Sequence, residues 1–282
     1  MPVAVVTDST AYLPDDLARA RNVTVVPLVV VMGGVEGREG VDVVPADVAR
    51  LLRSRRVDVK TSRPAPAEFV EAYQRLLATG ATGVVSVHLS QELSGTFDAA
   101  VLAAEEVGDS VAVVDSRATG MGLGFPALAA ASAAAAGGAL AGVRDAALGA
   151  VSRTTTLFYV DTLEFLRRGG RIGAASALVG TALAVKPILW MVDGRIVLRD
   201  KVRTASRALA RLVDLAVEAA GESEVDVAVH HLAMAERGAQ LMETVAERLG
   251  GRLRERYVCE LGPAVAAHVG PGFAGIVVHR CG

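Results

Sequence analysis

The chain is short of cysteine and carries almost no net charge, and each shortage excludes a class of protein. Cys259 and Cys281 are its only cysteines, too few for a disulfide framework in 282 residues and without metal-ligand spacing. A formal net charge of −2 provides no overall field that would attract nucleic acid or an anionic membrane surface. We therefore expect a cytoplasmic protein that needs no metal or cofactor and binds no nucleic acid.

The sequence pattern also predicts neither a signal peptide nor a membrane-spanning helix. The sequence starts directly with the strand-like "VAVVTDS", with no basic region or cleavage site, so we expect no signal peptide. Residues 125–143 carry no charge, which approaches membrane-spanning length. Because this run is mostly Ala and Gly, which gain little from lipid, we expect a packed helix without stable membrane insertion.

What the chain does contain is an alternation of β-branched runs and helical patterns. In the first half, "VAVVTDS", "VTVVPLVVV", "GVVSVHL" and "VAVVDS" are typical of buried strands with helices between them, which indicates a mostly parallel sheet. The second half has a hairpin pattern about Asp193-Gly194, long helices and a last strand, "AGIVVHR". We predict an α/β protein: an N-terminal, mostly parallel three-layer α/β/α domain over residues 1–150 and a C-terminal α+β domain over residues 151–282.

Hydroxyl and acidic residues gather where the predicted strands of the first domain end. They lie at 8–10 ("DST"), 90–96 ("SQELSGT") and 115–116 ("DS"), and a fourth hydroxyl pair at 61–62 ("TS") precedes Arg63-Pro64. In a parallel α/β sheet, ligands bind beyond the carboxyl ends of the strands. We therefore expect these stretches to converge on one rim of the sheet.

Ser94, Gly95 and Thr96 stand directly before a predicted helix, and two interpretations fit them. The first turn of a helix has unpaired N–H groups and a partial positive charge, and Gly95 lets another group approach the backbone closely, which suits a carboxylate or phosphate. Alternatively, Ser94 or Thr96 simply caps the helix. The local residues leave both interpretations open.

Catalytic motifs are absent around these residues. The string around Ser94 is not the G-x-S-x-G elbow, and no phosphate-binding loop of the form G-x-x-x-x-G-K-[ST] occurs. His268, in "AAHVGPGFAG", is expected on a turn, where it serves either as a structural histidine or as a donor to a bound anion. The adjacent His230 and His231 point to opposite faces of a predicted strand, so a shared metal is not expected.

Nine strings follow one another across nearly the whole chain: "VTDSTAYLP", "VVPLVV", "GREGVD", "KTSRPAPAEF", "LSQELSGTFDAA", "VVDSRATGMGLG", "LEFLRRGGRI", "KPIL…DGRI…KVRT" and "HVGPGFAG". Together, and in this order, they resemble the DegV family of bacterial fatty-acid-binding proteins.

This resemblance implies a function in lipid metabolism. It implies a two-domain protein that holds one long-chain fatty acid between its domains and presents it to a separate kinase subunit. That subunit, the catalytic part of a bacterial fatty acid kinase, would use ATP to phosphorylate the carboxylate for phospholipid synthesis. The binding protein itself would not be the enzyme.

The resemblance also implies a set of site residues. Thr61 and Ser94 match hydroxyls that hold the carboxylate, His268 matches a histidine near the head group, and Ser62 and Gly95 would add backbone N–H donors. One departure is Ala65, which stands where the family often has Ser, so one hydroxyl near Thr61 is missing.

Two basic positions resemble residues that would dock the kinase. Arg171 belongs to the basic group of "RRGGRI", and Arg203 to the group that follows the predicted hairpin turn. Two such groups in one domain could form a docking patch for an acidic partner.

The binding free energy of a fatty acid would come partly from its acyl chain and partly from its head group. Ten buried methylenes would contribute about 8 kcal/mol before association costs, against about 1.5–3 kcal/mol for a hydrogen bond to a charged group. The uncharged residues 172–185 and an aromatic content of 4% suit a tunnel of small aliphatic side chains, although ordinary core packing explains them equally well. Two other functions stay open: a serine-dependent lipid hydrolase that uses Ser94 and His268, and a lipid-sensing regulator without a kinase partner.

Overall fold

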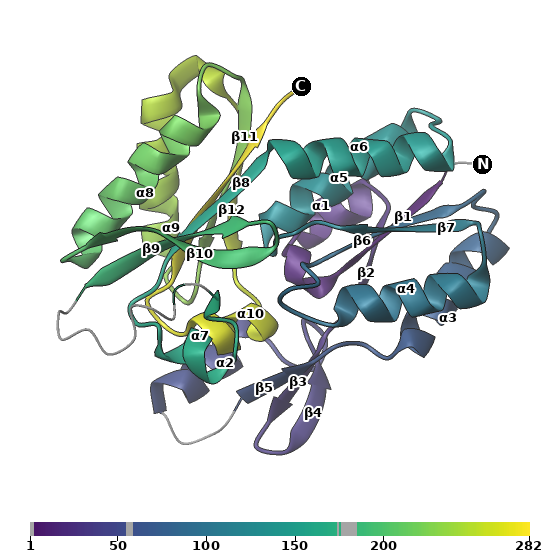
Figure 1. Cartoon of the computed structure of the whole chain (residues 1–282), viewed down its shortest axis with the longest axis horizontal. Coiled ribbons are helices and arrows are strands. Elements are labelled where there is room, and N and C mark those ends of the chain that lie inside the picture. The colour runs from purple at the N-terminus through teal and green to yellow at the C-terminus, as the bar shows by residue number, and fades with distance from the viewer. Residues whose placement is uncertain (1–2, 55–58, 174, 176–184) are drawn as a thin grey trace. The chain divides into compact units, whose positions relative to one another are not determined.

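The computed structural model describes residues 3–54, 59–173, 175 and 185–282 (Figure 1). Most of the apolar stretch 172–185, expected to line a tunnel, lies outside the described residues. The chain divides into two compact units, Met1–Val29 with Ser62–Ser152 and Val30–Thr61 with Arg153–Gly282. The second unit therefore includes residues 30–61, which the sequence division at residue 150 had grouped with the N-terminal half.

The first unit is built on a parallel four-stranded sheet. Its strands are β1 (Ala4–Asp8), β2 (Val23–Val26), β6 (Val84–His88) and β7 (Val111–Asp115), in the order β2-β1-β6-β7. Every residue of β6 is buried. A strand covered on both faces needs apolar side chains on both, which is why this sequence is a continuous run rather than an alternating one.

Helices cover both faces of this sheet and give it three layers. On one face α5 (Met121–Ala135) and α6 (Leu140–Arg153) share an apolar cluster with β1 and β6. On the other face α3 (Pro66–Ala78) and α4 (Thr96–Val107) pack on the same two strands. The short η1 (Ser9–Ala11) and α1 (Asp15–Ala20) follow β1. The uncharged run 125–143 is thus divided between two helices, and within the described part of the chain no helix is long and apolar enough to cross a membrane.

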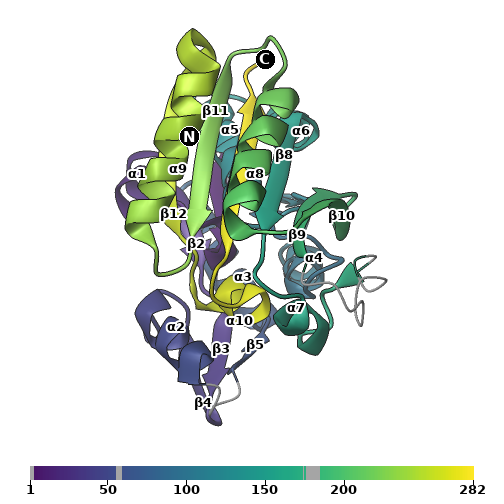
Figure 2. The same ribbon diagram turned by 90° about the vertical axis from the view of Figure 1, so that its left-hand side faces the viewer.

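The second unit has a mixed six-stranded sheet. Its strands are β8 (Thr154–Tyr159), β9 (Lys186–Val192), β10 (Arg195–Val202), β11 (Val225–His231), β12 (Leu253–Glu260) and β13 (Ala274–Arg280), in the order β10-β9-β8-β13-β11-β12. All neighbours are antiparallel except β11 and β12. The amphipathic helices α8 (Ala205–Ala220) and α9 (Ala235–Leu249) cover one face (Figure 2), and the short η3 (Gly250–Arg252) leads into β12.

Smaller elements complete the second unit. The strands β3 (Val29–Met32), β4 (Val35–Arg38) and β5 (Val59–Ser62) form a three-stranded sheet in the order β4-β3-β5. Three short helices, α2 (Pro45–Ser54), α7 (Glu164–Arg168) and α10 (Pro263–Val269), accompany it, and α10 packs against both α2 and α7. These elements carry Thr61 and His268.

The predicted α/β class, with a parallel α/β/α part and an α+β part, is confirmed. The hairpin is also confirmed, since Asp193 and Gly194 both have positive φ between β9 and β10, as a type I′ turn requires. The single strand expected at "VTVVPLVVV" is wrong. The chain leaves β2 at Val26, before Pro27, and enters β3 at Val29 in a different sheet. Proline has no N–H for a sheet ladder, so the run breaks there.

Helix packing on the first sheet can be tested with two leucines of the same unit. Leu123 in α5 is completely buried, whereas Leu102 in α4 is 51% exposed. We expect Leu123→Ala to lower the free energy of unfolding by about 2–5 kcal/mol, because it removes buried methylenes and leaves a cavity. Leu102→Ala should change it by less than about 0.5 kcal/mol. Urea unfolding followed by circular dichroism measures both, and equal losses would contradict the packing.

Candidate functional site

The loop between β6 and α4 carries the predicted anion-binding residues of the first unit. The helix begins with Gly95 as its N-cap, and no side chain caps it. Ser94 lies one residue earlier, and its Oγ is 3.0 Å from Oγ1 of Thr96 and accepts a long hydrogen bond, 3.4 Å, from the Thr96 N–H. Ser94 is therefore not the N-cap residue, and the first-turn N–H groups of α4 have the character that suits an anion.

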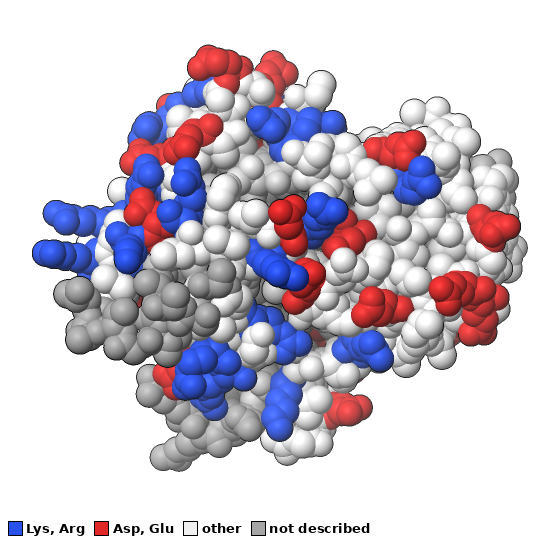
Figure 3. Space-filling view, in the orientation of Figure 1, with Lys and Arg blue, Asp and Glu red and all other residues white. Residues whose placement is uncertain are grey.

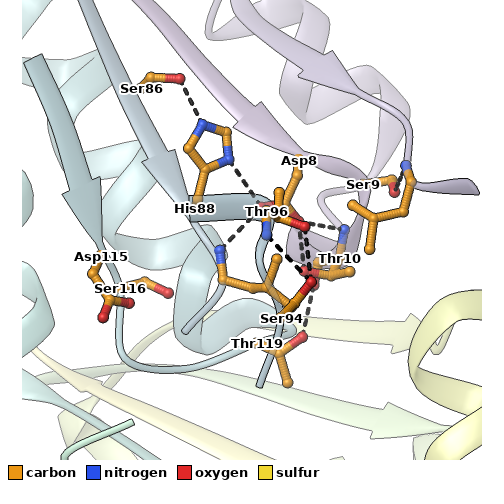
Figure 4. A network of polar contacts seen from close by, with 12 residues as sticks. Asp8, Ser9, Thr10, Ser86, His88, Ser94, Thr96, Asp115, Ser116 and Thr119 are labelled. Atoms are coloured by element: carbon orange, nitrogen blue, oxygen red, sulfur yellow. Dashed lines mark hydrogen bonds and ion pairs between the residues drawn. The ribbon is translucent and has the colours of Figure 1, made fainter. Parts of the chain in front are cut away.

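A buried polar network lies at the adjoining strand ends (Figure 4). The Asp8 carboxylate accepts hydrogen bonds from the N–H and the hydroxyl of Thr10 and from the N–H of Leu89, at 2.6–3.0 Å. Its Oδ2 is also 3.0 Å from Nδ1 of His88, and both side chains are completely buried. Asp8 therefore joins the end of β1 to the start of the loop that leads to Ser94.

This network lies at the topological switch point of the parallel sheet. From β1 the chain continues to β2, toward one edge of the sheet, and from β6 it continues to β7, toward the opposite edge. The two connections therefore diverge between Asp8 and His88. In open α/β sheets, ligands bind in the crevice beyond the strand ends at such a point. Of the four stretches expected on one rim, 8–10, 90–96 and 115–116 follow strands of this sheet, whereas 61–62 lies at the end of β5 in the three-stranded sheet.

The connectivity of Ser86, His88 and Asp8 matches that of a hydrolase triad, but their burial excludes a direct role in hydrolysis. Nε2 of His88 is 2.7 Å from the Ser86 Oγ, which in turn accepts a hydrogen bond of 2.8 Å from the Tyr73 hydroxyl. All four side chains are completely buried, whereas a nucleophile must reach its substrate. Sequence reasoning missed this network, although the alternation of Ser86 and His88 on one strand places both on the same face.

In the second unit, Thr61 and His268 are in contact although 207 residues separate them. Thr61 Oγ1 at the end of β5 is 2.9 Å from Nε2 of His268 in α10. Burial, and then the positive charge of Arg171, lower the pKa of His268 to about 4, so the ring is neutral at pH 7. The structure therefore brings together two of the residues that the sequence singled out.

The environment of the imidazole decides which nitrogen carries its proton. Nδ1 of His268 is buried and has no hydrogen-bond partner among the described residues. A buried N–H without a partner is rarer than a buried acceptor without one, so we assign the proton to Nε2. In that tautomer His268 donates to Thr61 Oγ1, and the Thr61 hydroxyl keeps its own proton for donation to another acceptor.

His268 was expected on a turn, and that expectation is wrong: it lies in the last turn of α10, which ends at Val269. Pro263 occupies the first helical position, the signal that could have revealed this helix. The buried carboxylate of Glu39 accepts the Ala264 N–H at 2.7 Å and so anchors the start of α10. Glu39 belongs to the string "GREGVD", for which the sequence alone suggested no role.

The two predicted backbone donors, Ser62 and Gly95, lie in a different unit from Thr61 and His268. Ser62 is exposed, and its hydroxyl donates a long hydrogen bond, 3.4 Å, to the carbonyl of Arg63. Gly95 contacts the Arg63 side chain so closely that a Cβ on it would lie 2.7 Å from Nη1. Ser62 and Gly95 belong to the first unit with Ser94, whereas Thr61 and His268 belong to the second.

The two predicted docking residues differ in their surroundings. Arg171 is half-buried and donates to the carbonyl of Gly169. Arg203 is exposed between β10 and α8. Figure 3 shows Lys and Arg side chains, interspersed with acidic ones, over the part of the second unit that carries the β9–β10 hairpin. In the described ranges, no group of three His, Cys, Asp or Glu side chains is arranged to hold a metal ion.

The chain is thus an α/β protein in which hydroxyl residues end β5, at Thr61 and Ser62, and in which Ser94 and Gly95 precede α4. The model of the DegV family, described as an uncharacterised protein family, matches residues 2–280, and the chain belongs to this family. A DegV domain-containing protein of Streptomyces coelicolor is 51% identical over 276 residues, with 98% of each chain covered. Another from Mycobacterium tuberculosis is 44% identical, covering 99% of this chain and 97% of the relative.

Solved structures of two relatives have the same fold. The structure of a DegV family protein from Thermus thermophilus, described by its fatty acid binding, superposes with a TM-score of 0.94 at 33% identity. DegV from Bacillus subtilis, described as a fatty acid binding protein, gives a TM-score of 0.90 at 31% identity. Both comparisons cover 100% of each chain. The family resemblance and the fold predicted from the sequence are thereby confirmed.

The depressed pKa of His268 predicts a dependence on pH. Its ring should titrate near pH 4 rather than at the ordinary 6.5. Between these two pH values the unfolded chain binds the proton more readily than the folded chain does. The contribution of His268 to the free energy of unfolding is therefore fully present above pH 6.5 and is lost as the pH falls to about 4. Histidine Cε1–H resonances followed by NMR give the pKa, and His268→Gln identifies the resonance by removing it. A pKa at or above 6.5 would contradict the burial of the ring.

Proposed function

We propose that this protein binds one long-chain fatty acid and presents its carboxylate to a separate, ATP-dependent fatty acid kinase. The observation that carries the proposal is the contact between Thr61 and His268, because it leaves a hydroxyl proton for donation to a carboxylate. The fatty acid binding for which the Thermus thermophilus and Bacillus subtilis relatives are described supports the same ligand class.

The head group is assigned to two hydroxyls and their neighbours. Thr61 and Ser94 each donate to the carboxylate, His268 orients Thr61, and the backbone N–H groups of Ser62 and Gly95 complete the seat. Each component is a neutral donor, and donors of this kind hold a carboxylate without protonating it. That the ligand is held between an N-terminal domain (1–150) and a C-terminal domain (151–282) is part of the proposal.

The acyl chain supplies most of the affinity in this proposal. Ten buried methylenes contribute about 8 kcal/mol before association costs, more than any single head-group hydrogen bond. The hydroxyls therefore determine which end of the ligand occupies the seat. The tunnel proposed for the acyl chain requires only apolar side chains, and hydrophobic residues make up 52% of this sequence.

Chemistry on the carboxylate belongs to the partner. The kinase transfers the γ-phosphoryl group of ATP to a carboxylate oxygen, which yields an acyl phosphate and ADP, in the cytoplasm where ATP is available. The acyl phosphate then enters phospholipid synthesis. Arg171 and Arg203 are the basic residues proposed to dock the kinase, through charge complementarity that favours encounter and register.

Binding is tested first with the purified chain. Native mass spectrometry should find one fatty acid per chain, either co-purified or after addition of palmitate. Ser94→Ala should weaken palmitate binding about 10- to 150-fold, the loss expected for one hydrogen bond to a charged group. Ser152→Ala, which removes an exposed hydroxyl of α6, is the matched control and should bind normally. A wild-type protein that binds neither palmitate nor oleate would disprove the proposal, and normal binding by Ser94→Ala would remove Ser94 from the site.

Docking is tested separately from binding. Arg203→Glu should retain palmitate affinity, since the residue is exposed on the β10–α8 connection, but should reduce acyl phosphate formation by the kinase. Reversal of one charge at a complementary surface typically lowers the association rate and its salt dependence. Arg144→Glu on α6 controls for the change in net charge. Unchanged acyl phosphate formation by Arg203→Glu would exclude this residue from docking.

The two alternative functions give different outcomes in the same assays. A hydrolase that uses Ser94 and His268 would react with a fluorophosphonate probe, yet the Nε2 of His268 is hydrogen-bonded to Thr61 rather than to Ser94. A regulator without a kinase would bind palmitate normally but recover no kinase from the cell. The contact of His268 with Thr61 favours binding over hydrolysis.

A further inference from the structure

Gly169, in the string "RRGG", lies against the His268 ring. A Cβ built on Gly169 would be 2.2 Å from Nδ1 and 3.1 Å from Cε1 of His268. Contacts under 3.0 Å do not occur for real Cβ atoms. No side chain larger than hydrogen therefore fits at this position while the ring stays in place.

The backbone of Gly169 gives no other reason for glycine. Its φ of −75° and ψ of −8° lie in the ordinary right-handed helical region, which every residue adopts. Gly270 and Gly272, in the facing "GPG" segment, both have positive φ, so their backbone favours glycine in any case. At Gly169 the main obstacle to a side chain is the neighbouring ring, since the next group, the Phe165 carbonyl oxygen, would lie 3.2 Å from the added Cβ.

His268 has little room to move away from Gly169. Its helix is anchored at the start by the buried Glu39 carboxylate, and the residues on either side of it, Ala267 and Val269, are buried. On its other edge, Nε2 holds Thr61 Oγ1 at 2.9 Å. The ring is confined between Thr61 and the Cα of Gly169, which also accounts for an Nδ1 that is buried without a partner among the described residues.

We propose that Gly169 is a positioning residue for the head-group seat: the absence of a side chain there sets the His268 ring at hydrogen-bonding distance from the Thr61 hydroxyl. This inference rests on the proposed fatty acid binding. Gly169 itself touches no ligand and acts only through His268. A methyl group at this position would displace the ring and leave the Thr61 hydroxyl unoriented.

The first test is Gly169→Ala, titrated with palmitate by calorimetry. We expect roughly a five- to tenfold loss of affinity, the equivalent of one hydrogen bond between neutral groups. Gly251→Ala is the matched control, because a Cβ there meets no atom within 4 Å, and it should bind like the wild type. An unchanged affinity in Gly169→Ala would overturn the proposal.

A double-mutant cycle distinguishes positioning from a general structural effect. In a His268→Ala background the obstructing ring is gone, so adding Gly169→Ala should change palmitate affinity less than about twofold. An equal loss in both backgrounds would show that Gly169 acts independently of His268 and would overturn the proposal. If Gly169→Ala alone fails to fold, the double variant should fold, and failure of both would also contradict it.

A ligand-free measurement separates this inference from the proposed function. The His268 Cε1–H resonance should shift in Gly169→Ala, and its pKa should move from about 4 toward 6.5 as the displaced ring becomes better solvated. An unchanged resonance would overturn the positioning role. If the wild type binds no fatty acid but this shift occurs, the proposed function fails while the role of Gly169 stands.

Discussion

The contact between Thr61 and His268 is the interaction on which the site of the second unit depends. It joins β5 to α10 across most of the sequence. Burial keeps the ring neutral, and a neutral ring has one donor and one acceptor. With the proton on Nε2, the Thr61 hydroxyl must donate elsewhere. The direction of this one hydrogen bond is therefore what makes Thr61 a donor in the proposed anion site.

The Asp8 network and the Thr61–His268 contact differ in how completely their buried polar atoms are hydrogen-bonded. In the first, the Asp8 carboxylate is hydrogen-bonded to Thr10 in η1 and to His88 and Leu89 at the end of β6, and a buried network whose members are satisfied fixes the surrounding backbone. In the second, Nδ1 of His268 lacks a described partner and is tolerated because it is a bare acceptor. The first arrangement stabilises the loop before Ser94, whereas the second leaves the Thr61 hydroxyl proton for donation to another acceptor.

Much of the fold could be predicted from the sequence, because buried parallel strands and an Asp-Gly hairpin leave clear local patterns. The break at Pro27 was missed, since "VTVVPLVVV" is apolar on both sides and only the tertiary assignment of Val29 shows that a new sheet begins. The contact of Thr61 with His268 could not be derived locally either. Only tertiary packing brings these two residues together. The contact of Gly169 with the His268 ring likewise arises only when α10 packs against α7.

The neutrality of the proposed seat also fits the reaction assigned to the partner. A carboxylate oxygen that attacks a phosphoryl group must remain ionised and must not be held in a tight ion pair, which would lower its reactivity. A histidine with the ordinary pKa of 6.5 would be partly protonated near neutral pH and would pair with the carboxylate. With its pKa lowered to about 4, His268 stays uncharged and acts through the Thr61 hydroxyl. In the proposed function, the burial that sets the tautomer therefore also keeps the carboxylate available as the nucleophile for the kinase.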